Sequence, residues 1–222
     1  MIVTVENLTH RYGARLALAG LSFAVEKGRV FGLLGPNGGG KSTLFRILAT
    51  MMPPDEGRAL VAGFDVVRQS AEVRRRIGVV FQTNSLDRKL TVEENLVSQG
   101  HLFGMSGRRL AARAEAVMER LGLTGRRGDP VGTLSGGLQR RVEIAKALLH
   151  EPEILLMDEP STGLDPGARR ELWEHVESLR AAYGVTVLLT THILEEAERC
   201  SRLLLLHQGR RVAEGTPAEL KA

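Results

Sequence analysis

One octapeptide constrains this chain more than any other feature of its sequence. Residues 35–42 read GPNGGGKS and fit the pattern G-x-x-x-x-G-K-[ST]. The preceding run at residues 30–34 is almost wholly apolar, and residues 42–48 carry apolar side chains at helical spacing. The pattern alone would also fit a glycine-rich turn with an incidental lysine, but the order strand, glycine loop, helix is the context that confirms it. The sequence therefore predicts a phosphate-binding loop after a central strand of a parallel sheet.

The residue types of this phosphate loop have separate tasks. Glycines let backbone N–H groups curl around phosphate oxygens, and the N-terminus of the following helix adds a partial positive charge. We expect Lys41 to reach the β- and γ-phosphates of a nucleotide and Ser42 to bind Mg²⁺. The residues expected to contact the nucleotide here are Gly35, Pro36, Asn37, Gly38, Gly39, Gly40, Lys41, Ser42 and Thr43.

Two adjacent carboxylates follow a second apolar run. Residues 154–157 are all apolar, and Asp158 and Glu159 come next. Ligands of a parallel α/β sheet bind at the carboxyl ends of its strands. Burying two neighbouring carboxylates there is costly unless a cation or a reacting proton compensates them. A solvated turn is the alternative, but beside a phosphate loop the pair favours a metal-binding Asp158 followed by a proton-accepting Glu159.

Strand-like and helix-like segments alternate over most of the chain. Further apolar or alternating runs lie at residues 2–5, 21–25, 77–81, 185–189 and 203–206. Asp165 and the proline after it predict the start of a helix that ends near Gly184. Strands that alternate with helices over this length predict a doubly wound α/β sheet.

The pattern changes between Leu90 and about His150, where helix signals replace strand-like runs. Thr91 and Glu94 form a capping box. Apolar residues then recur at helical spacing at Leu110, Ala114, Val117 and Leu121. This stretch is predicted to be an all-helical insertion.

Composition narrows the class of protein. The apolar runs fall far short of the roughly 20 residues that a membrane-spanning helix needs, and the first residues do not resemble a secretory signal, so we expect a cytosolic protein. The single cysteine cannot form an internal disulfide. The 30 basic residues are interleaved with 26 acidic ones, and this excess is too small to indicate a partner. We expect no specific nucleic-acid partner.

Residues 134–139, LSGGLQ, resemble the signature sequence of ABC ATPases. Physically, Ser135 would cap the following helix, while Gly136 and Gly137 would keep its first N–H groups uncovered, which makes a second anion site in the same chain. A lone S-G-G is weak evidence. The other elements of the family also occur here, however, in the family's order.

Four of these elements lie outside the phosphate loop and the signature. Tyr12 looks like the aromatic residue on which adenine stacks, and Gln82 is similar to the Q-loop glutamine. Residues 161–165, STGLD, resemble the D-loop that ends in Asp165, and His192 resembles the switch histidine. Each alone also fits a plainer interpretation as an ordinary half-buried aromatic, strand-end or helix-cap residue. Together they cover nearly the whole chain.

The resemblance implies a fold and a mechanism. The fold is a doubly wound P-loop (RecA-like) core with a small antiparallel β subdomain, at residues 1–89 and 151–222, and an inserted helical signature subdomain at residues 90–150. Two such domains would meet head to tail, with ATP held between the phosphate loop of one and residues 135–137 of the other. Glu159 would be the general base and His192 would contact the γ-phosphate, with Lys41 also catalytic. Asp158 and Gln82 would hold Mg²⁺ and its waters.

Within the family, residues 84–87, 90–96 and 192–198 look most like subunits of drug-resistance and other ABC-2-type exporters. This resemblance implies a homodimer or a pseudo-dimer with a second ABC ATPase subunit. It also implies an integral membrane permease that inserts a helix near residues 86–90, and a location on the inner face of the cell membrane. The alternatives are a non-transport ABC ATPase, for example in cofactor assembly, and a nucleotide-dependent binding module without turnover.

Overall fold

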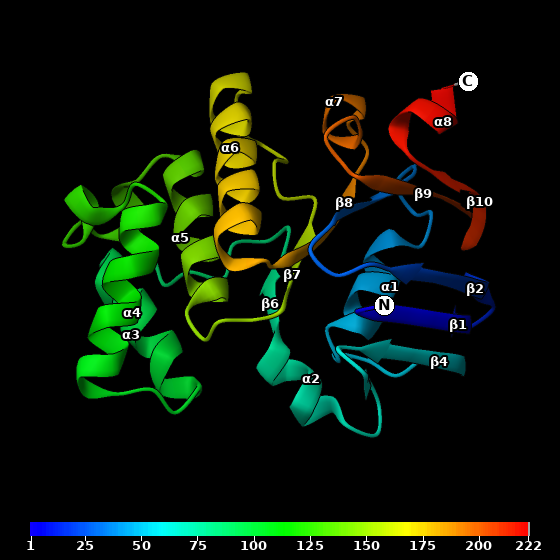
Figure 1. Cartoon of the computed structure of the whole chain (residues 1–222), viewed down its shortest axis with the longest axis horizontal. Helices are drawn as coiled ribbons and strands as arrows, with labels where there is room; N and C mark the ends of the chain where they lie inside the picture. The colour runs from blue at the N-terminus through cyan, green and yellow to red at the C-terminus, as the bar shows by residue number, and fades with distance from the viewer. Residues whose placement is uncertain (222) are drawn as a thin grey trace.

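The computed structural model describes residues 1–221 and contains two sheets (Figure 1). The larger sheet has six strands in the order β10-β9-β3-β8-β7-β6. Strands β9, β3, β8, β7 and β6 pair in parallel, and β10 pairs antiparallel with β9. The bounds are β3 (Val30–Leu34), β6 (Ile77–Val80), β7 (Ile154–Asp158), β8 (Thr186–Thr191), β9 (Arg202–His207) and β10 (Arg210–Gly215). The predicted α/β class is confirmed.

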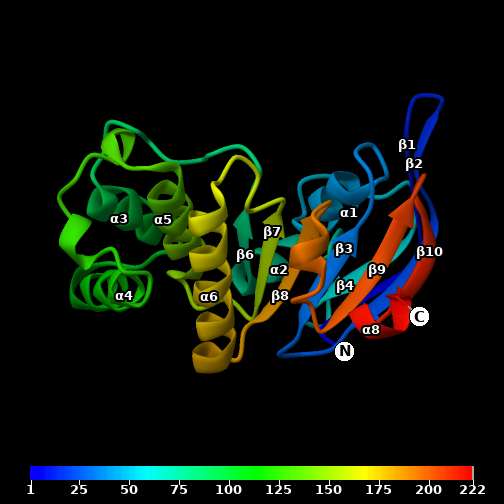
Figure 2. The ribbon, with the colours of Figure 1, turned by 90° about the horizontal axis from the view of Figure 1, so that it is seen from above.

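A smaller antiparallel sheet forms from the N-terminal part of the chain. Its order is β2-β1-β4-β5, with β1 (Val3–Tyr12), β2 (Arg15–Val25), β4 (Glu56–Val61) and β5 (Phe64–Asp65). Apolar side chains of this sheet share one buried cluster with α1 (Lys41–Leu48) and with one face of the larger sheet. Helix α1, which follows the phosphate loop, is therefore packed between the two sheets (Figure 2).

Strand β7 shows how the larger sheet is covered on both faces. All five of its residues are buried, which explains its continuous apolar run. Successive side chains of a strand point to opposite faces. Accordingly Ile154 and Leu156 belong to the cluster around α1, whereas Leu155 and Met157 belong to the cluster built with α5 (Gly136–Leu148) and α6 (Pro166–Tyr183). The sheet is thus doubly wound.

The helical stretch lies on the far side of α6 from the smaller sheet (Figures 1 and 2). It consists of α3 (Val92–Leu102), α4 (Gly107–Arg120), two short 3₁₀ turns and α5. The capping box is present, because the Glu94 N–H donates to Thr91 Oγ1 and the Thr91 N–H donates to the Glu94 carboxylate. The remaining helices are α2 (Ser70–Arg76), α7 (Leu194–Ala197) and α8 (Pro217–Lys221).

Two turns follow helices α1 and α7. Helix α1 ends at Leu48, and Thr50, which takes a left-handed conformation (φ 60°), turns the chain after it. Cys200 lies in the turn between α7 and β9, where it is buried. Over residues 1–221, none of the helices combines the length and the apolar character needed to cross a bilayer.

Candidate nucleotide-binding site

The phosphate loop connects β3 to α1, and glycine is required at two of its positions. A Cβ atom on Gly35 would lie 2.1 Å from the carbonyl oxygen of Leu206. Gly40, the N-cap of α1, has φ 106°, and a Cβ there would lie 2.6 Å from the carbonyl oxygen of Ala17. Strand β9 and strand β2 therefore press against the loop from two sides, and only residues without a side chain allow this approach.

Lys41 points back into the loop. Its Nζ donates to the carbonyl oxygens of Gly35 at 2.7 Å and Pro36 at 3.2 Å, and it lies 3.4 Å from Glu159 Oε1. The residue is 4% exposed. The ammonium group is therefore held at the position where the loop would enclose phosphates, and a nucleotide would replace weak carbonyl contacts by stronger ones.

Asp158 and Glu159 lie where β7 ends, next to β8. Thr190 Oγ1 donates to Asp158 Oδ1 at 2.5 Å and accepts from the Glu159 N–H at 2.9 Å. Ser42 Oγ lies 3.4 Å from Asp158 Oδ1. Glu159 itself has φ 46°, a conformation that non-glycine residues rarely adopt. Hydroxyl and carboxylate oxygens at this spacing are the hard ligands that suit Mg²⁺.

The Glu159 carboxylate is the point at which several predicted residues meet. Gln82 Nε2 donates to its Oε2 at 3.3 Å, and His192 Nδ1 lies 3.4 Å from its Oε1. Lys41 contacts the same oxygen as His192. Thr162 Oγ1 also donates to Oε2, at 3.3 Å. The chain therefore brings Gln82, Lys41, Glu159 and His192 together from four separate parts of the sequence.

A cavity of about 380 Å³ opens beside this cluster. Its predicted lining residues are Tyr12, Pro36, Asn37, Gly38, Gly40, Lys41, Ser42, Thr43, Gln82 and Glu159. Asp158 faces a neighbouring cavity that shares Tyr12, Ser42 and Gln82. Gly35 and Gly39 belong to the loop but do not line the cavity. Most of the predicted phosphate loop, Glu159 and Tyr12 thus line one space large enough for a small ligand, and Asp158 lines the cavity next to it.

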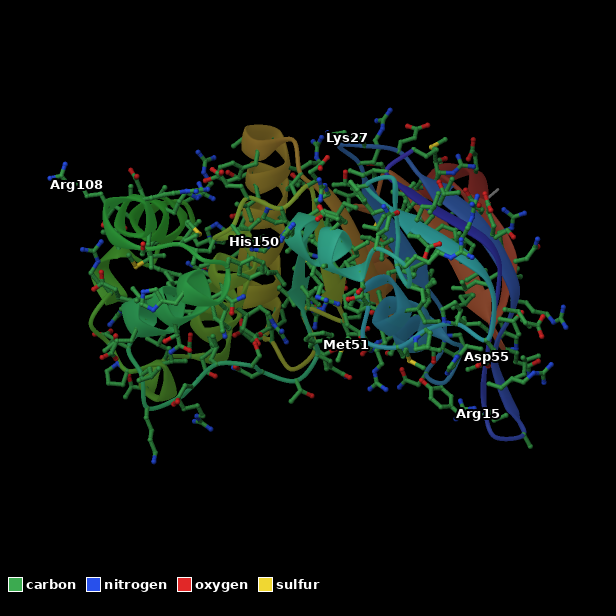
Figure 3. All side chains as sticks on the ribbon, turned by 90° about the horizontal axis from the view of Figure 1, so that it is seen from below. Arg15, Lys27, Met51, Asp55, Arg108 and His150 are labelled. Atoms are coloured by element: carbon green, nitrogen blue, oxygen red, sulfur yellow. The ribbon has the colours of Figure 1, made fainter. Side chains whose placement is uncertain are left out.

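Sequence reasoning missed Arg15, Ala17 and Arg46, which also line this cavity. Arg15 Nη2 donates to the Gly38 carbonyl at 3.2 Å, and Figure 3 shows Arg15 at the end of the molecule opposite to Arg108. A longer strand in this region would have indicated two of them, because Arg15 and Ala17 are two residues apart on β2 and share a face. That strand was expected to start only at residue 21.

The predicted signature residues and Asp165 lie outside the cavity. Ser135 accepts from the Leu138 N–H at 3.4 Å and caps α5, and Ser135 and Gly136 are exposed, with Gly137 half-buried. Asp165 Oδ1 accepts from the Ala168 N–H at 3.0 Å and caps α6; this hydrogen bond holds the pKa of Asp165 below its ordinary value. A single chain therefore does not bring residues 135–137 to its own phosphate loop.

Helix α5 also holds the segment that carries Gln82. Arg140 Nη1 donates to the Phe81 carbonyl at 2.7 Å and to the Glu143 carboxylate at 2.6 Å, and its Nη2 donates to the Gln82 carbonyl at 3.3 Å. Glu143 Oε1 accepts from the Ser85 N–H at 2.8 Å. Burial raises the pKa of the Glu143 carboxyl. The sequence analysis did not identify these contacts. The feature that could have indicated them is the spacing of three positions between Arg140 and Glu143, which places both on one face of a helix.

The fold and the site together define a P-loop ATPase of the ABC class. The model of the ABC transporter family matches residues 18–162. This chain belongs to the ABC transporter family, and the predicted resemblance is confirmed. Membership implies that the chain binds ATP and hydrolyses it.

Relatives agree with this assignment. Daunorubicin resistance ATP-binding protein DrrA2 of Streptomyces coeruleorubidus is 48% identical over 99% of this chain and 68% of its own length. Nod factor export ATP-binding protein I of Ralstonia nicotianae is 45% identical over the same shares. Among solved structures, cbiO1 of Clostridium perfringens, part of the ABC transporter complex cbiONQ, has a TM-score of 0.91 at 30% identity, covering 99% of this chain and 90% of that chain.

Proposed function

We propose that this chain is the ATP-hydrolysing subunit of a membrane exporter. Two similar proteins are named for drug resistance and for Nod factor export. The observation that supports turnover most directly is the convergence of Lys41, Gln82 and His192 on the buried Glu159 carboxylate beside the phosphate loop. A module that only bound nucleotide would have no need for this arrangement.

In this proposal Glu159 takes a proton from the water that attacks the γ-phosphate. Lys41 and the loop N–H groups hold the β- and γ-phosphates, and His192 contacts the γ-phosphate. Ser42 and Asp158 would hold Mg²⁺, with the Gln82 amide oxygen toward its waters; the bound ion neutralises charge on the phosphate oxygens. The protein's task is mainly positioning and charge stabilisation, as in other phosphoryl transfers. Tyr12, at the rim of the cavity, would stack on adenine.

The proposal also requires a second ATPase domain. Residues 135–137 lie at the exposed or half-exposed start of α5 and do not line the cavity of their own chain. A head-to-tail dimer would place them on the ATP held by the other subunit, with Asp165 at the same interface. The partner is a second copy or a related ABC subunit.

A membrane permease completes the proposed assembly. In this proposal residues 90–150 would be the helical signature subdomain, and residues 1–89 and 151–222 would be the P-loop core with its β subdomain. The permease would insert a helix between the helical subdomain and the exposed segment near residues 86–90. The ATPase would then sit on the cytoplasmic face of the membrane, as a peripheral subunit.

The test of the proposal is Glu159→Gln. Glutamine keeps the size of glutamate but cannot accept the proton, and general-base catalysis is worth about 10²- to 10⁴-fold, so steady-state hydrolysis should fall by at least roughly 10². ATP binding should persist, because one negative charge near the triphosphate is removed. The variant should elute as a dimer from a sizing column with ATP and Mg²⁺, and Glu195→Gln, exposed on α7, is the control. Hydrolysis within a few-fold of wild type would exclude Glu159 as the base.

Co-purification separates the proposal from its alternative. Expressed with its own membrane subunit, the chain should be recovered with membranes on their cytoplasmic side. A stable complex with soluble proteins alone would instead support a non-transport ATPase, such as one in cofactor assembly.

A further inference from the structure

One buried carboxylate outside the cavity joins two loops of the site. Glu196 lies in α7 and is 1% exposed. Ser161 Oγ donates to Glu196 Oε1, and Thr191 Oγ1 donates to Glu196 Oε2 at 2.5 Å. Ser161 stands two positions after Glu159, and Thr191 stands immediately before His192. The two hydroxyl groups that Glu196 binds therefore belong to the loop after β7 and to the end of β8.

On the β8 side, the contact fixes the turn that carries His192. A hydroxyl group has one proton to donate, and Thr191 donates it to Glu196. Thr191 Oγ1 then accepts from the Ile193 N–H at 3.0 Å. His192 thus stands in the chain between Thr191 and Ile193, and the Thr191 hydroxyl oxygen contacts both Glu196 and the Ile193 N–H. Because a carboxylate oxygen of Glu196 accepts the Thr191 hydroxyl proton, Thr191 Oγ1 is left to accept from the Ile193 N–H.

On the β7 side, the contact holds a loop in a strained conformation. The φ of 46° at Glu159 is unfavourable for a residue with a side chain, and it persists only where the surrounding structure holds it. Thr190 holds the Glu159 N–H from one face of β8. Thr191 points to the opposite face of the strand and reaches Ser161 through Glu196. Adjacent threonines therefore hold the loop from both faces.

Stability alone does not account for a carboxylate at this place. Taking a carboxylate out of water is costly, and an apolar residue of similar volume in the same buried position often gives a protein that is equally or more stable. Two charge-assisted hydrogen bonds, each roughly twice as strong as a neutral one, fix geometry as well as energy. The arrangement therefore favours a role in holding the two loops at a set separation.

We propose that Glu196 is a positioning residue for ATP hydrolysis, which sets the loop carrying Glu159 and Ser161 against the turn carrying His192. The proposal rests on the hydrolytic function proposed for Glu159 and His192. Glu196 does not touch the nucleotide or the attacking water. It acts through Ser161 and Thr191, so its loss should reduce turnover and leave nucleotide binding nearly intact.

Glu196→Gln tests this role in the full-length chain. The amide has only one acceptor oxygen, so one of the two hydroxyl groups must reverse its hydrogen bond or lose it. Small misplacements of reacting groups cost up to about 10²-fold in rate, and we expect kcat to fall by roughly 10- to 10²-fold. The KM and Kd for ATP should stay within a few-fold of wild type. Glu195→Gln, the exposed neighbour on α7, should behave as wild type.

A pair of hydroxyl variants keeps the test independent of the folding of Glu196→Gln. Thr191→Val has the shape of threonine without the hydroxyl and should lower kcat, whereas Thr191→Ser should retain most of it. Ser161→Ala should also lower kcat without changing the KM for ATP. If Glu196 couples the two loops, the double variant Thr191→Val/Ser161→Ala should lose much less kcat than the product of the two single losses.

Three results would overturn the proposal. The first is a kcat within two-fold of wild type in Thr191→Val and Ser161→Ala. The second is multiplication of the two single losses in the double variant, which indicates independent packing roles. The third is a KM for ATP that rises as much as kcat falls. Failure of the proposed function is distinct, because Glu159→Gln would then remain active whatever Glu196 does.

Discussion

At the residue scale, Lys41 is the side chain whose removal has the clearest consequence. Its ammonium group is the mobile cation that the phosphate loop supplies, and it is already directed at the loop carbonyls. Hydrogen bonds to charged groups contribute about 1.5–3 kcal/mol, so Lys41→Ala should weaken ATP binding by roughly 10- to 10²-fold and abolish hydrolysis. Nucleotide titration and steady-state turnover measure this. Lys27→Ala, an exposed lysine paired with Glu153, is the control, and near-normal turnover of Lys41→Ala would contradict the site.

A second residue makes stability depend on pH. His150 lies between the helical stretch and the larger sheet (Figure 3), stacks on Phe103 at 3.8 Å and donates from Nε2 to the Ile77 carbonyl. Burial lowers the pKa of His150 below its ordinary value of 6.5. As the pH falls through 6.5, the unfolded chain gains the proton first, so the free energy of unfolding should decrease from there toward the folded pKa.

His150→Gln should flatten this dependence, because glutamine can donate to the same carbonyl without titrating. Urea unfolding at pH 7.5 and pH 5.5 would show a smaller difference in the variant than in wild type. Some slope should remain, since burial also lowers the pKa of His175. An unchanged difference between the two pH values would show that His150 does not contribute.

At the scale of elements, helix α5 links the signature segment to the segment that carries Gln82. Arg140→Ala would leave the Glu143 carboxylate buried without its partner, which should lower the free energy of unfolding by about 3–5 kcal/mol. Replacing both residues by methionine should restore most of the stability. Turnover should be low in Arg140→Ala and should remain low in the double methionine variant, because the Phe81 and Gln82 carbonyls receive no hydrogen bonds from residue 140 in either. Denaturant unfolding and ATPase assays of the two variants together test this, and full recovery of turnover would contradict it.

The sequence predicted those elements best whose burial is uniform. Strands β3 and β7 were expected because nearly every side chain is apolar, and the capping box of α3 is a local pattern. Strands β4 and β10 were missed because each begins with three exposed residues and contains charged ones, so neither shows a continuous apolar run. Glu196 was missed for another reason. Its role depends on hydroxyl groups 5 and 35 positions away, and no local pattern signals this contact.

At the scale of the whole molecule, the two anion sites of one chain serve different nucleotides in the proposed dimer. Ser135→Arg should therefore leave ATP binding by the monomer intact and block hydrolysis, because the arginine would obstruct the opposite subunit's nucleotide. ATP titration of the monomer and turnover at high protein concentration measure the two effects separately. If binding fell as much as turnover, the composite site would be wrong. Thr133→Arg, an exposed position two residues earlier, tests whether any added charge here has the same effect.

The order of strands in the larger sheet also governs how the protein is made. Within residues 1–221, strand β3, which precedes the phosphate loop, pairs with β8 and β9 alone, and Leu34 lies opposite Thr191. A ribosome adds about 5–20 residues per second, so β3 waits for roughly ten seconds or more before its neighbours leave the exit tunnel. During that interval its apolar edges have no partners within the sheet. A nascent chain that ends before β8 therefore lacks both neighbours of β3, and the phosphate loop can reach its place beside β8 and β9 only after residue 207 has been synthesised.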